Sequence, residues 1–456
     1  MVNASVFSDT LKTLSVILGA DEAALRLLIS ILGGYPLAIF YRKFIYGRGK
    51  NLQHIFFIFT GFLLGYLNYG SDVVHLFVTM GCTYAILVAL GGTVAAVAAV
   101  FIFSMLYLSI GYYIMSTDSY DINWTMPHCV LTLRLIGIAF DYMDGQQNEE
   151  SLGADGKKYM LKTLPNVLEF LGFASFPTTL LVGPQFPMKR YQSFVNGDFG
   201  DPNNPSKPPS SESSAFNRFG MGFFYLMLYQ FLGLFVSDAF LLSQDFKDFS
   251  FMRKHLLLGL WGRFTLYKYI SCWLLAEGSC ILFGITYNGT DQSGKKLWNG
   301  LENVKLARFE SATQFNHYIQ SFNINTNHWV AHYIYKRLKF LGNRHLSQAG
   351  ALLFLAVWHG YHSGYFVCFL CEFLVIYVER DISSIIKSSE KLTQIFDQAL
   401  VDIAVKLLLR LYTFVFMGFC LVPFVLLNLE KYWEVYISIN YSGVVLFFYI
   451  RFYGGP

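Results

Sequence analysis

The chain has 456 residues, of which 54% are hydrophobic, 18% aromatic and only 14% charged. Soluble globular domains carry charged side chains at roughly a quarter of their positions, so this composition excludes an ordinary soluble domain and indicates a membrane protein. The formal net charge of +4 is small and no basic low-complexity arm is present, which argues against nucleic acid as a partner.

Long apolar stretches recur along the whole chain. The longest lies between Lys50 and Arg134, where no lysine or arginine occurs. It can supply two membrane spans of about 20 residues each, with a break at Gly91 and Gly92. The other candidate spans, in chain order, are residues 23–41, 55–68, 166–182, 219–242, 256–283, 350–378, 401–427 and 435–452, with shorter segments at 130–140 and 329–341. We therefore predict an all-α, polytopic membrane protein of about eleven transmembrane helices.

The distribution of basic residues predicts how the chain is oriented in the membrane. Residues 1–21 lack the features of a cleavable signal peptide, so the first span is expected to insert uncleaved. Four lysines and arginines lie in residues 42–50, directly after that span, and short positive loops stay in the cytosol, which puts the amino terminus in the lumen. Two glycosylation sequons, at Asn3 and Asn123, then also face the lumen, and a third lies at Asn288.

Two polar segments separate the apolar stretches. Residues 196–214 are dense in Pro, Ser, Asn and Gly, which predicts a solvated loop without helix or strand. Residues 287–316 form the second polar segment, and residues 246–268 mix charged and aromatic side chains in a pattern typical of helices in the membrane interface. No internal repeat of fixed period is evident, and we expect residues 1–456 to form a single domain.

Seven cysteines fall almost entirely within the apolar segments, and their odd number excludes a complete disulfide framework. We expect them to be packing residues. Cys368 and Cys371 form a C-x-x-C pattern, but a redox or metal-binding role is disfavoured for such a pair inside an apolar helix.

Two histidines, His359 and His362, interrupt the apolar stretch 352–377, whose only formally charged side chain is Glu372. Ionisable groups at bilayer depth cost a few kcal/mol each and usually mark a transport pathway or a reaction centre. We expect an uninterrupted helix, in which the two rings share one face, so a metal site is an alternative, although no nearby acid completes a zinc set. His362 suits a structural histidine bonded to a carbonyl, whereas His359 precedes Gly360, which lets another group approach, and can accept a proton when neutral.

Three asparagines alternate with other residues in the segment SFNINTNHW, at positions 323, 325 and 327. This spacing favours an extended or looped backbone. A buried amide without a partner costs a few kcal/mol, so these groups must pair with each other, with the backbone or with a ligand. The alternative is an asparagine-rich turn before the helix that begins at Trp329, with Asn327 as the helix cap.

Four sequence blocks resemble the membrane-bound O-acyltransferase family. They are WHGYHSGY around the two histidines, SFNINTNHWVAHYIYKRLKFLGN before them, and the earlier FPTTLLVGPQFPMKRYQSF and PHCVLTLRLIGIAFDYMDG. The resemblance covers nearly the whole chain, and the paired asparagine and histidine blocks are its most specific part. Carried over residue by residue, the family's catalytic histidine falls on His359 and its partner asparagine falls on Asn323.

This resemblance implies that about eleven helices enclose a reaction tunnel in the endoplasmic reticulum membrane. It implies transfer of a polyunsaturated fatty acyl group from acyl-CoA to the free hydroxyl of a lysophospholipid, chiefly lysophosphatidylcholine, in phospholipid remodelling. His359 would act as general base, and Asn323 would orient the acceptor or the histidine, or stabilise the oxyanion. Acyl-CoA is then a co-substrate, and neither a tightly bound cofactor nor a metal ion is expected.

The resemblance assigns no CoA-binding residues and no oligomeric state. Lys336, Arg337 and Lys339 are candidates for the phosphates of CoA, but they equally suit a positive anchor at a cytosolic helix end. The competing function is a secondary transporter or channel in which the histidines and asparagines form a relay. That alternative predicts broken helices and pseudo-symmetric halves, neither of which is evident in the sequence.

Overall fold

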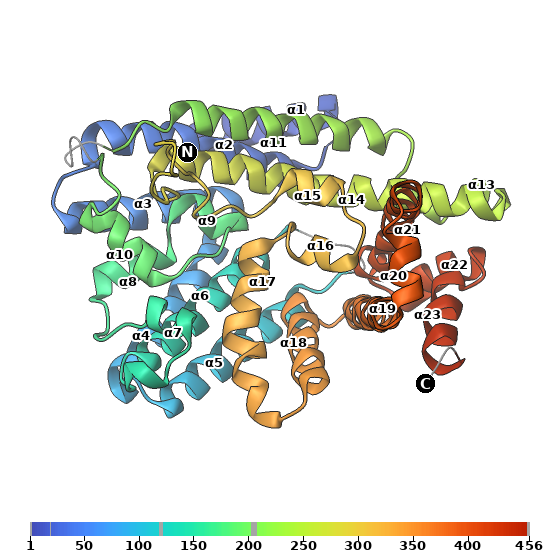
Figure 1. Ribbon diagram of the computed structural model, residues 1–456. Coiled ribbons are helices and arrows are strands. Elements are labelled where there is room, and N and C mark those ends of the chain that lie inside the picture. Colours follow the sequence, from blue (N-terminus) through green and yellow to red (C-terminus); the bar gives the residue numbers. More distant parts are fainter. Residues whose placement is uncertain (1, 19, 118–121, 202–207, 454–456) are drawn as a thin grey trace. The chain divides into compact units, whose positions relative to one another are not determined.

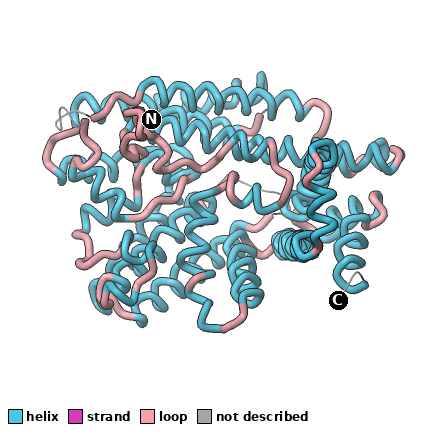
Figure 2. Tube along the Cα trace, in the orientation of Figure 1, coloured by secondary structure: helices cyan, strands magenta, loops and turns pink. Residues whose placement is uncertain are grey.

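The structure, a computed structural model, describes residues 2–18, 20–117, 122–201 and 208–453. Regular structure in these ranges is helical (Figure 1). Figure 2 shows the helices joined by loops, and isolated bridges pair Thr290 with Lys296 and Val304 with Phe322. The prediction of an all-helical chain is therefore confirmed for the described residues.

The helices follow one another with short connections. In chain order they are α1 (Val2–Leu18), α2 (Glu22–Phe40), the π-helix η1 (Tyr41–Ile45), α3 (Lys50–Tyr69), the 3₁₀ turn η2 (Gly70–Val73), α4 (Val74–Leu90), α5 (Val94–Met115), α6 (Thr125–Asp144), η3 (Glu149–Ser151), α7 (Ala154–Tyr159), α8 (Val167–Ala174), α9 (Pro177–Val182), α10 (Met188–Asn196), α11 (Glu212–Gly233), α12 (Asp238–Leu241), α13 (Gln244–Asp248) and α14 (Phe251–Phe283). The remaining elements are α15 (Leu306–Glu310), α16 (Phe315–Ile319), α17 (Ile324–Val330), the π-helix η4 (Ala331–Tyr335), the 3₁₀ turn η5 (Arg337–Leu341), α18 (Arg344–His359), α19 (Ser363–Ser388), α20 (Glu390–Phe396), α21 (Ala399–Leu426), α22 (Leu429–Ser438) and α23 (Ser442–Tyr453).

Among the described residues, five helical segments are long and apolar enough to cross a membrane. They are Glu22–Ile45, Lys50–Leu90, Val94–Met115, Glu212–Leu241 and Ala399–Leu426.

The chain divides into two compact units. The first comprises Met1–Met115, Asp121–Phe223 and Cys272–Asn303, and the second comprises Ser116–Tyr120, Phe224–Ser271 and Val304–Pro456.

An aromatic core holds the first unit together. The fully buried ring of Phe57 on α3 contacts six other rings at centroid separations between 4.8 and 6.1 Å. These rings belong to Tyr41, Phe56, Phe176, Tyr191, Phe194 and Phe283. Such edge and tilted aromatic contacts add packing energy to the burial of the rings, so helices distant in sequence are fixed against one another.

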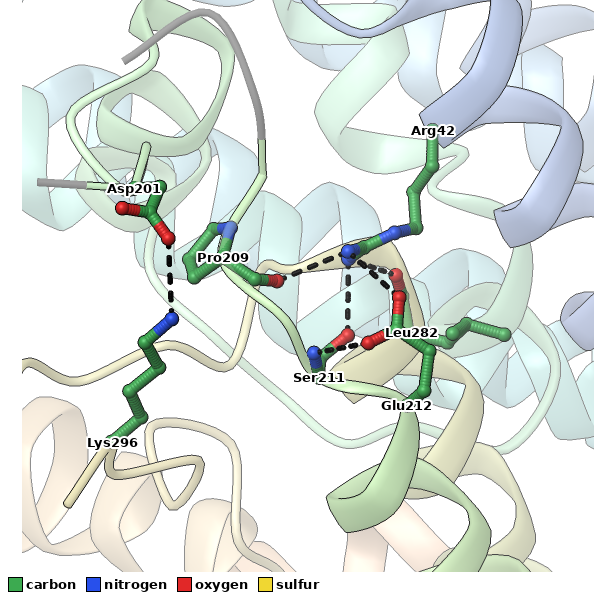
Figure 3. Close-up of polar contacts among 7 residues, drawn as sticks. All are labelled: Arg42, Asp201, Pro209, Ser211, Glu212, Leu282 and Lys296. Carbon is green, nitrogen blue, oxygen red and sulfur yellow. Dashed lines mark hydrogen bonds and ion pairs between the residues drawn. The ribbon is translucent and has the colours of Figure 1, made fainter. Parts of the chain in front are cut away.

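Within the first unit, Arg42 connects the polar loop before α11 with the end of α14 (Figure 3). Its guanidinium donates to the carbonyl oxygens of Pro209 at 3.0 Å and Leu282 at 3.1 Å, and it pairs with Glu212 at 3.2 Å. The predicted polar loop 196–214 falls between α10, which ends at Asn196, and α11, which begins at Glu212, and residues 202–207 lie outside the described ranges.

The predicted span 166–182 is wrong as a single helix, because it divides into α8 and α9 before Pro177. The residue before a proline is pushed out of the helical region, which ends the hydrogen-bond ladder there. Arg134 of α6 donates hydrogen bonds to the backbone carbonyls around the break. These carbonyls belong to Phe173, Ala174 and Thr179, at 2.9 to 3.2 Å.

Close packing of α19 against α21 organises the second unit. A β carbon added at Gly364 would lie 1.9 Å from the carbonyl oxygen of Pro423, so only glycine permits this approach. The amide of Gly364 donates to the carbonyl of Leu427 at 3.2 Å. The start of α19 is therefore fixed at the end of α21.

The predicted span 435–452 is also wrong as a continuous helix, because α22 ends at Ser438 and α23 begins at Ser442. Asn440 and Tyr441 adopt left-handed backbone conformations, with φ of 55° and 51°, which no helix can include. The predicted span 219–242 agrees with the candidate membrane span Glu212–Leu241, within which α11 ends at Gly233 and α12 begins at Asp238.

Candidate active site

One of the two predicted catalytic residues, Asn323, directly precedes a helical hairpin in the second unit, and the other, His359, is its last residue. The hairpin consists of α17, its continuation through η4 and η5, and α18, and we call it the α17–α18 hairpin (residues 324–359; Figure 1). Gly342 turns the chain with φ +66°. The side chain of Asn343 then accepts hydrogen bonds from the amides of His345 and Leu346, which caps the first turn of α18.

Two contacts fix the register of this hairpin. The ring of Trp329 stacks on Phe354 with centroids 5.7 Å apart, and the hydroxyl of Ser347 donates to the carbonyl of Leu338 at 3.0 Å. Asn323 is six residues before Trp329 and His359 is five residues after Phe354, about 9 and 7.5 Å of helical rise. The antiparallel register therefore brings Asn323 and His359 to the same end of the hairpin.

Asn323 occupies the residue before α17 in a left-handed conformation, with φ +49° and ψ +44°. The predicted extended backbone is wrong, because the two following asparagines, at 325 and 327, lie within α17. Asparagine is one of the few residues that tolerate this conformation, since its short polar side chain can bond locally. Asn323 directly follows Phe322, which forms a backbone bridge with Val304.

Asn327 stabilises the turn that presents Asn323. Its side-chain nitrogen donates to the carbonyl of Ile319 at 3.0 Å and to that of Phe322 at 2.9 Å. The expectation that Asn327 caps the helix is therefore wrong, because it lies one turn inside α17 and donates to carbonyls outside the helix. Its role in the structure is to close the loop that precedes the helix.

His359 is the last residue of α18, and Gly360 ends that helix with φ +137°, a conformation that side chains rarely adopt. The predicted uninterrupted helix over 352–377 is therefore wrong. The chain leaves the helical path for three residues, and α19 begins at Ser363. His359 and His362 consequently lie on opposite sides of a break and do not share a helix face.

Four aromatic rings surround the imidazole of His359. Their centroids lie 4.6 Å away for Trp358, 5.0 Å for Phe424, 5.5 Å for Tyr365 and 5.6 Å for Phe369. The imidazole keeps part of its surface accessible, and it forms no hydrogen bond with any residue that the structure describes. Its proton-accepting nitrogen is thus not occupied by a neighbouring side chain.

His362 does not make the carbonyl hydrogen bond that we predicted for it, as far as the described residues extend. It lies half-buried at the start of α19, with its ring 6.2 Å from that of Tyr365. The prediction depended on a continuous helix through residue 362, and the break at Gly360 removes that helix.

The cations considered for CoA lie at the far end of the α17–α18 hairpin from His359. Lys336 and Lys339 are exposed, and Arg337 is half-buried at the start of η5.

No group of three or more histidine, cysteine, aspartate or glutamate side chains that could hold a metal ion occurs among the described residues. The seven cysteines are all free thiols. Cys368 lies buried and Cys371 half-buried on α19, which fits the prediction that they pack between helices.

A sequence pattern described as the membrane-bound O-acyltransferase family matches residues 109–451, which is most of the chain and includes both predicted catalytic residues. The chain belongs to the membrane-bound O-acyltransferase family. The family resemblance expected from the sequence blocks is thereby confirmed, and the protein is a multi-pass membrane protein.

Relatives in the membrane-bound O-acyltransferase family are similar to this chain over nearly its whole length. It is 43% identical to human lysophospholipid acyltransferase 5 over 443 residues, covering 97% of this chain and 91% of the human protein. It is 44% identical to lysophospholipid acyltransferase 5 of Drosophila melanogaster over 432 residues, which cover 93% of this chain and 85% of the fly protein. The protein of that name in Caenorhabditis elegans is 36% identical over 442 residues, covering 96% and 92%.

Part of the site could not be found from the sequence of this membrane-bound O-acyltransferase. Phe424 reaches His359 from α21, and nothing in its local sequence distinguishes it from the other phenylalanines of that apolar helix. His359 and Asn323 could be found from the sequence, because histidine and asparagine are unusual in apolar segments.

Proposed function

We propose that the protein transfers a fatty acyl group from acyl-CoA to the free hydroxyl of a lysophospholipid. The observation that carries this proposal is 43% identity to a lysophospholipid acyltransferase over 97% of the chain. We further propose a single acyltransferase domain over residues 1–456, with about eleven helices around a reaction tunnel in the endoplasmic reticulum membrane. The five candidate spans support the multi-pass part of that proposal.

In this reaction His359 acts as the general base. A glycerol hydroxyl is a poor nucleophile until its proton is removed during attack, and general-base help typically raises the rate by about 10²- to 10⁴-fold. The absence of a hydrogen-bond partner for the half-buried His359 among the described residues supports this role. The hydroxyl oxygen attacks the thioester carbonyl, His359 takes the proton, and CoA leaves as a thiolate without an enzyme-bound acyl intermediate.

Asn323 serves the same step from the opposite helix of the hairpin. A side-chain amide can orient the acceptor hydroxyl or the imidazole, or it can donate to the oxyanion that forms on the thioester carbonyl. The register that brings Asn323 level with His359 supports each of these roles.

The substrates proposed from the family resemblance are lysophosphatidylcholine as acceptor and polyunsaturated acyl-CoA as donor. The phosphates of CoA require a cationic mouth, and the cations at positions 336, 337 and 339 lie at the far end of the hairpin from His359. This separation suits a donor whose charged nucleotide and reactive thioester lie far apart. The same cations also suit a cytosolic helix anchor.

The experiment that tests the proposed function is an assay of purified protein with labelled acyl-CoA and lysophosphatidylcholine. We expect labelled phosphatidylcholine to form in proportion to the protein added. The break at Gly360 is a feature that a transporter would share, so the protein should also be reconstituted in vesicles. Movement of a substrate across the membrane without any esterified product would contradict the proposal.

A further inference from the structure

The imidazole of His359 is not oriented by a hydrogen bond within the described part of the chain. Where histidine acts as a general base, a carboxylate or a carbonyl usually bonds the second ring nitrogen, which fixes the tautomer and the direction of the ring. His359 lacks this support, and it is the last residue of α18, where Gly360 ends the helix. The orientation of its ring must therefore be set by packing.

Two rings of α19 lie nearly parallel to the imidazole. The ring of Tyr365 is 5.5 Å from it at an interplanar angle of 32°, and the ring of Phe369 is 5.6 Å from it at 29°. These two residues are four positions apart, so they belong to the same face of α19. If the imidazole turned about its bond to the β carbon, it would lose the parallel contact with both rings.

Phe424 completes this arrangement from α21. Its ring stands nearly perpendicular to the imidazole, 5.0 Å away at 79°, an edge-to-face geometry that aromatic pairs prefer. The same ring contacts Tyr365 at 5.1 Å and Phe369 at 6.4 Å. The carbonyl oxygen of the preceding residue, Pro423, lies against Gly364 at the start of α19. Phe424 is thus in contact with the base and with both rings that lie parallel to it.

We propose that Phe424 is a positioning residue that, together with the two rings of α19, holds the imidazole of His359 in the orientation in which a ring nitrogen meets the acceptor hydroxyl. This inference rests on the proposed function, because it concerns the base of that reaction. The rings do for His359 what a hydrogen-bonded carboxylate does for a histidine in a polar site. Rings also suit an apolar surrounding, where an additional carboxylate would be costly to bury.

Two exchanges at position 424 separate the ring from the apolar volume. Phe424→Leu keeps an apolar side chain and removes the flat ring, whereas Phe424→Tyr keeps the ring. A misplaced base slows the chemical step and leaves substrate binding unchanged. We expect Phe424→Leu to lower kcat about 10- to 100-fold at unchanged KM for both substrates, and Phe424→Tyr to stay within about twofold of the wild type. Wild-type kcat in Phe424→Leu, or equal losses in the two variants, would overturn the assignment.

The same exchange in a His359→Ala protein distinguishes a positioning role from a structural one. If Phe424 acts only through the imidazole, adding Phe424→Leu should leave the residual turnover of His359→Ala unchanged, because the two effects are then fully coupled. An equal fold loss of turnover in the wild-type and His359→Ala backgrounds would mean that Phe424 supports the fold or the substrate, and would overturn the proposal.

Phe416→Leu is the matched control on the same helix, eight residues or about 12 Å of helical rise before Phe424. The ring of Phe416 packs against Tyr412, Phe419 and Phe447, so its loss should lower thermal stability and leave kcat unchanged. A loss of kcat equal to that of Phe424→Leu would refute the positioning role.

A variant on α19 keeps the test decisive if Phe424→Leu does not fold. Phe369→Leu removes one of the two parallel rings, and we expect the same fall in kcat at unchanged KM; wild-type kcat in that variant overturns the proposal. The wild-type assay separates the two proposals. Wild-type protein that forms no esterified product refutes the proposed function, whereas a normal wild-type rate that is insensitive to loss of these rings refutes only the positioning role.

Discussion

Asn323 combines two properties that substitution can separate. Its backbone adopts a left-handed conformation with φ +49°, and its side chain carries the amide that we propose acts in the reaction. Glycine tolerates that backbone but has no amide, whereas alanine loses the amide and also strains the turn by about 1 kcal/mol.

We therefore expect Asn323→Gly to keep the thermal stability of the wild type and to lose about 10²-fold in kcat, the usual effect of removing one oxyanion donor. Asn323→Ala should lose as much activity and also unfold at lower temperature. Both quantities can be measured on detergent-purified protein. Wild-type turnover in Asn323→Gly would mean that this residue only shapes the backbone.

Asn327 supports the site without touching substrate. Asn327→Asp replaces a donor by an acceptor opposite the carbonyls of Ile319 and Phe322, so we expect a loss of about 1 to 3 kcal/mol in stability. The control is Asn316→Asp at an exposed position on α16. Thermal unfolding of both variants gives the comparison, and equal melting temperatures would refute a bracing role for Asn327.

At the scale of helices, the seam between α19 and α21 brings Phe424 to His359. Gly364→Ala would place a methyl group 1.9 Å from the carbonyl oxygen of Pro423, the residue before Phe424. The two helices must separate to accept it, which typically costs about 1 to 3 kcal/mol. We expect a lower melting temperature together with reduced turnover.

The matched control is Gly220→Ala on α11, where an added β carbon meets nothing within 4 Å. This exchange should be neutral or slightly stabilising, because alanine favours helix more than glycine does. A Gly364→Ala variant as stable and active as Gly220→Ala would show that the seam does not need its close approach.

The sequence predicts helices well where apolar residues run without interruption, as in α2, α5 and α21. It misses breaks whose cause lies elsewhere in the fold. The break before Pro177 is stabilised by Arg134, whose guanidinium donates to the carbonyl of Ala174, 40 residues away in sequence. The break at Gly360 could have been anticipated only from a single glycine, which a helix pattern tolerates.

At the scale of the whole molecule, contacts of Arg42 and Lys296 in the first unit bear on orientation in the membrane. Arg42 belongs to the basic cluster predicted to be cytosolic, and it bonds both the loop before α11 and the end of α14. Lys296 pairs with Asp201 at 3.2 Å, so the polar segment after α14 lies with that loop (Figure 3). The exposed sequon at Asn288 should consequently be cytosolic.

We expect Asn288 to carry no glycan when the protein is made in eukaryotic cells. A chain whose other sequons are removed by Asn3→Gln, Asn123→Gln and Ser442→Ala should migrate identically before and after glycosidase treatment. Adding Thr290→Ala, which destroys the sequon at Asn288, should change nothing. A glycosidase-sensitive band that disappears with Thr290→Ala would place this segment in the lumen and reverse the predicted orientation.

The asparagine and histidine blocks could be recognised from the sequence because amides and imidazoles are rare in apolar segments. The sequence could not show that Asn323 and His359 lie at the same end of the hairpin, since this depends on the contact of Trp329 with Phe354. The sequence also marked Glu372 as a lone charge, and the structure places it half-buried on α19.

The central claim is that His359 removes a proton from the acceptor hydroxyl, and the most direct test is the rate of acyl transfer by His359→Ala. We expect turnover to fall by about 10²- to 10⁴-fold with unchanged thermal stability. The control His345→Ala, at an exposed position near the start of the same helix, should retain the wild-type rate. A folded His359→Ala protein that esterifies lysophosphatidylcholine as fast as the wild type would contradict the account.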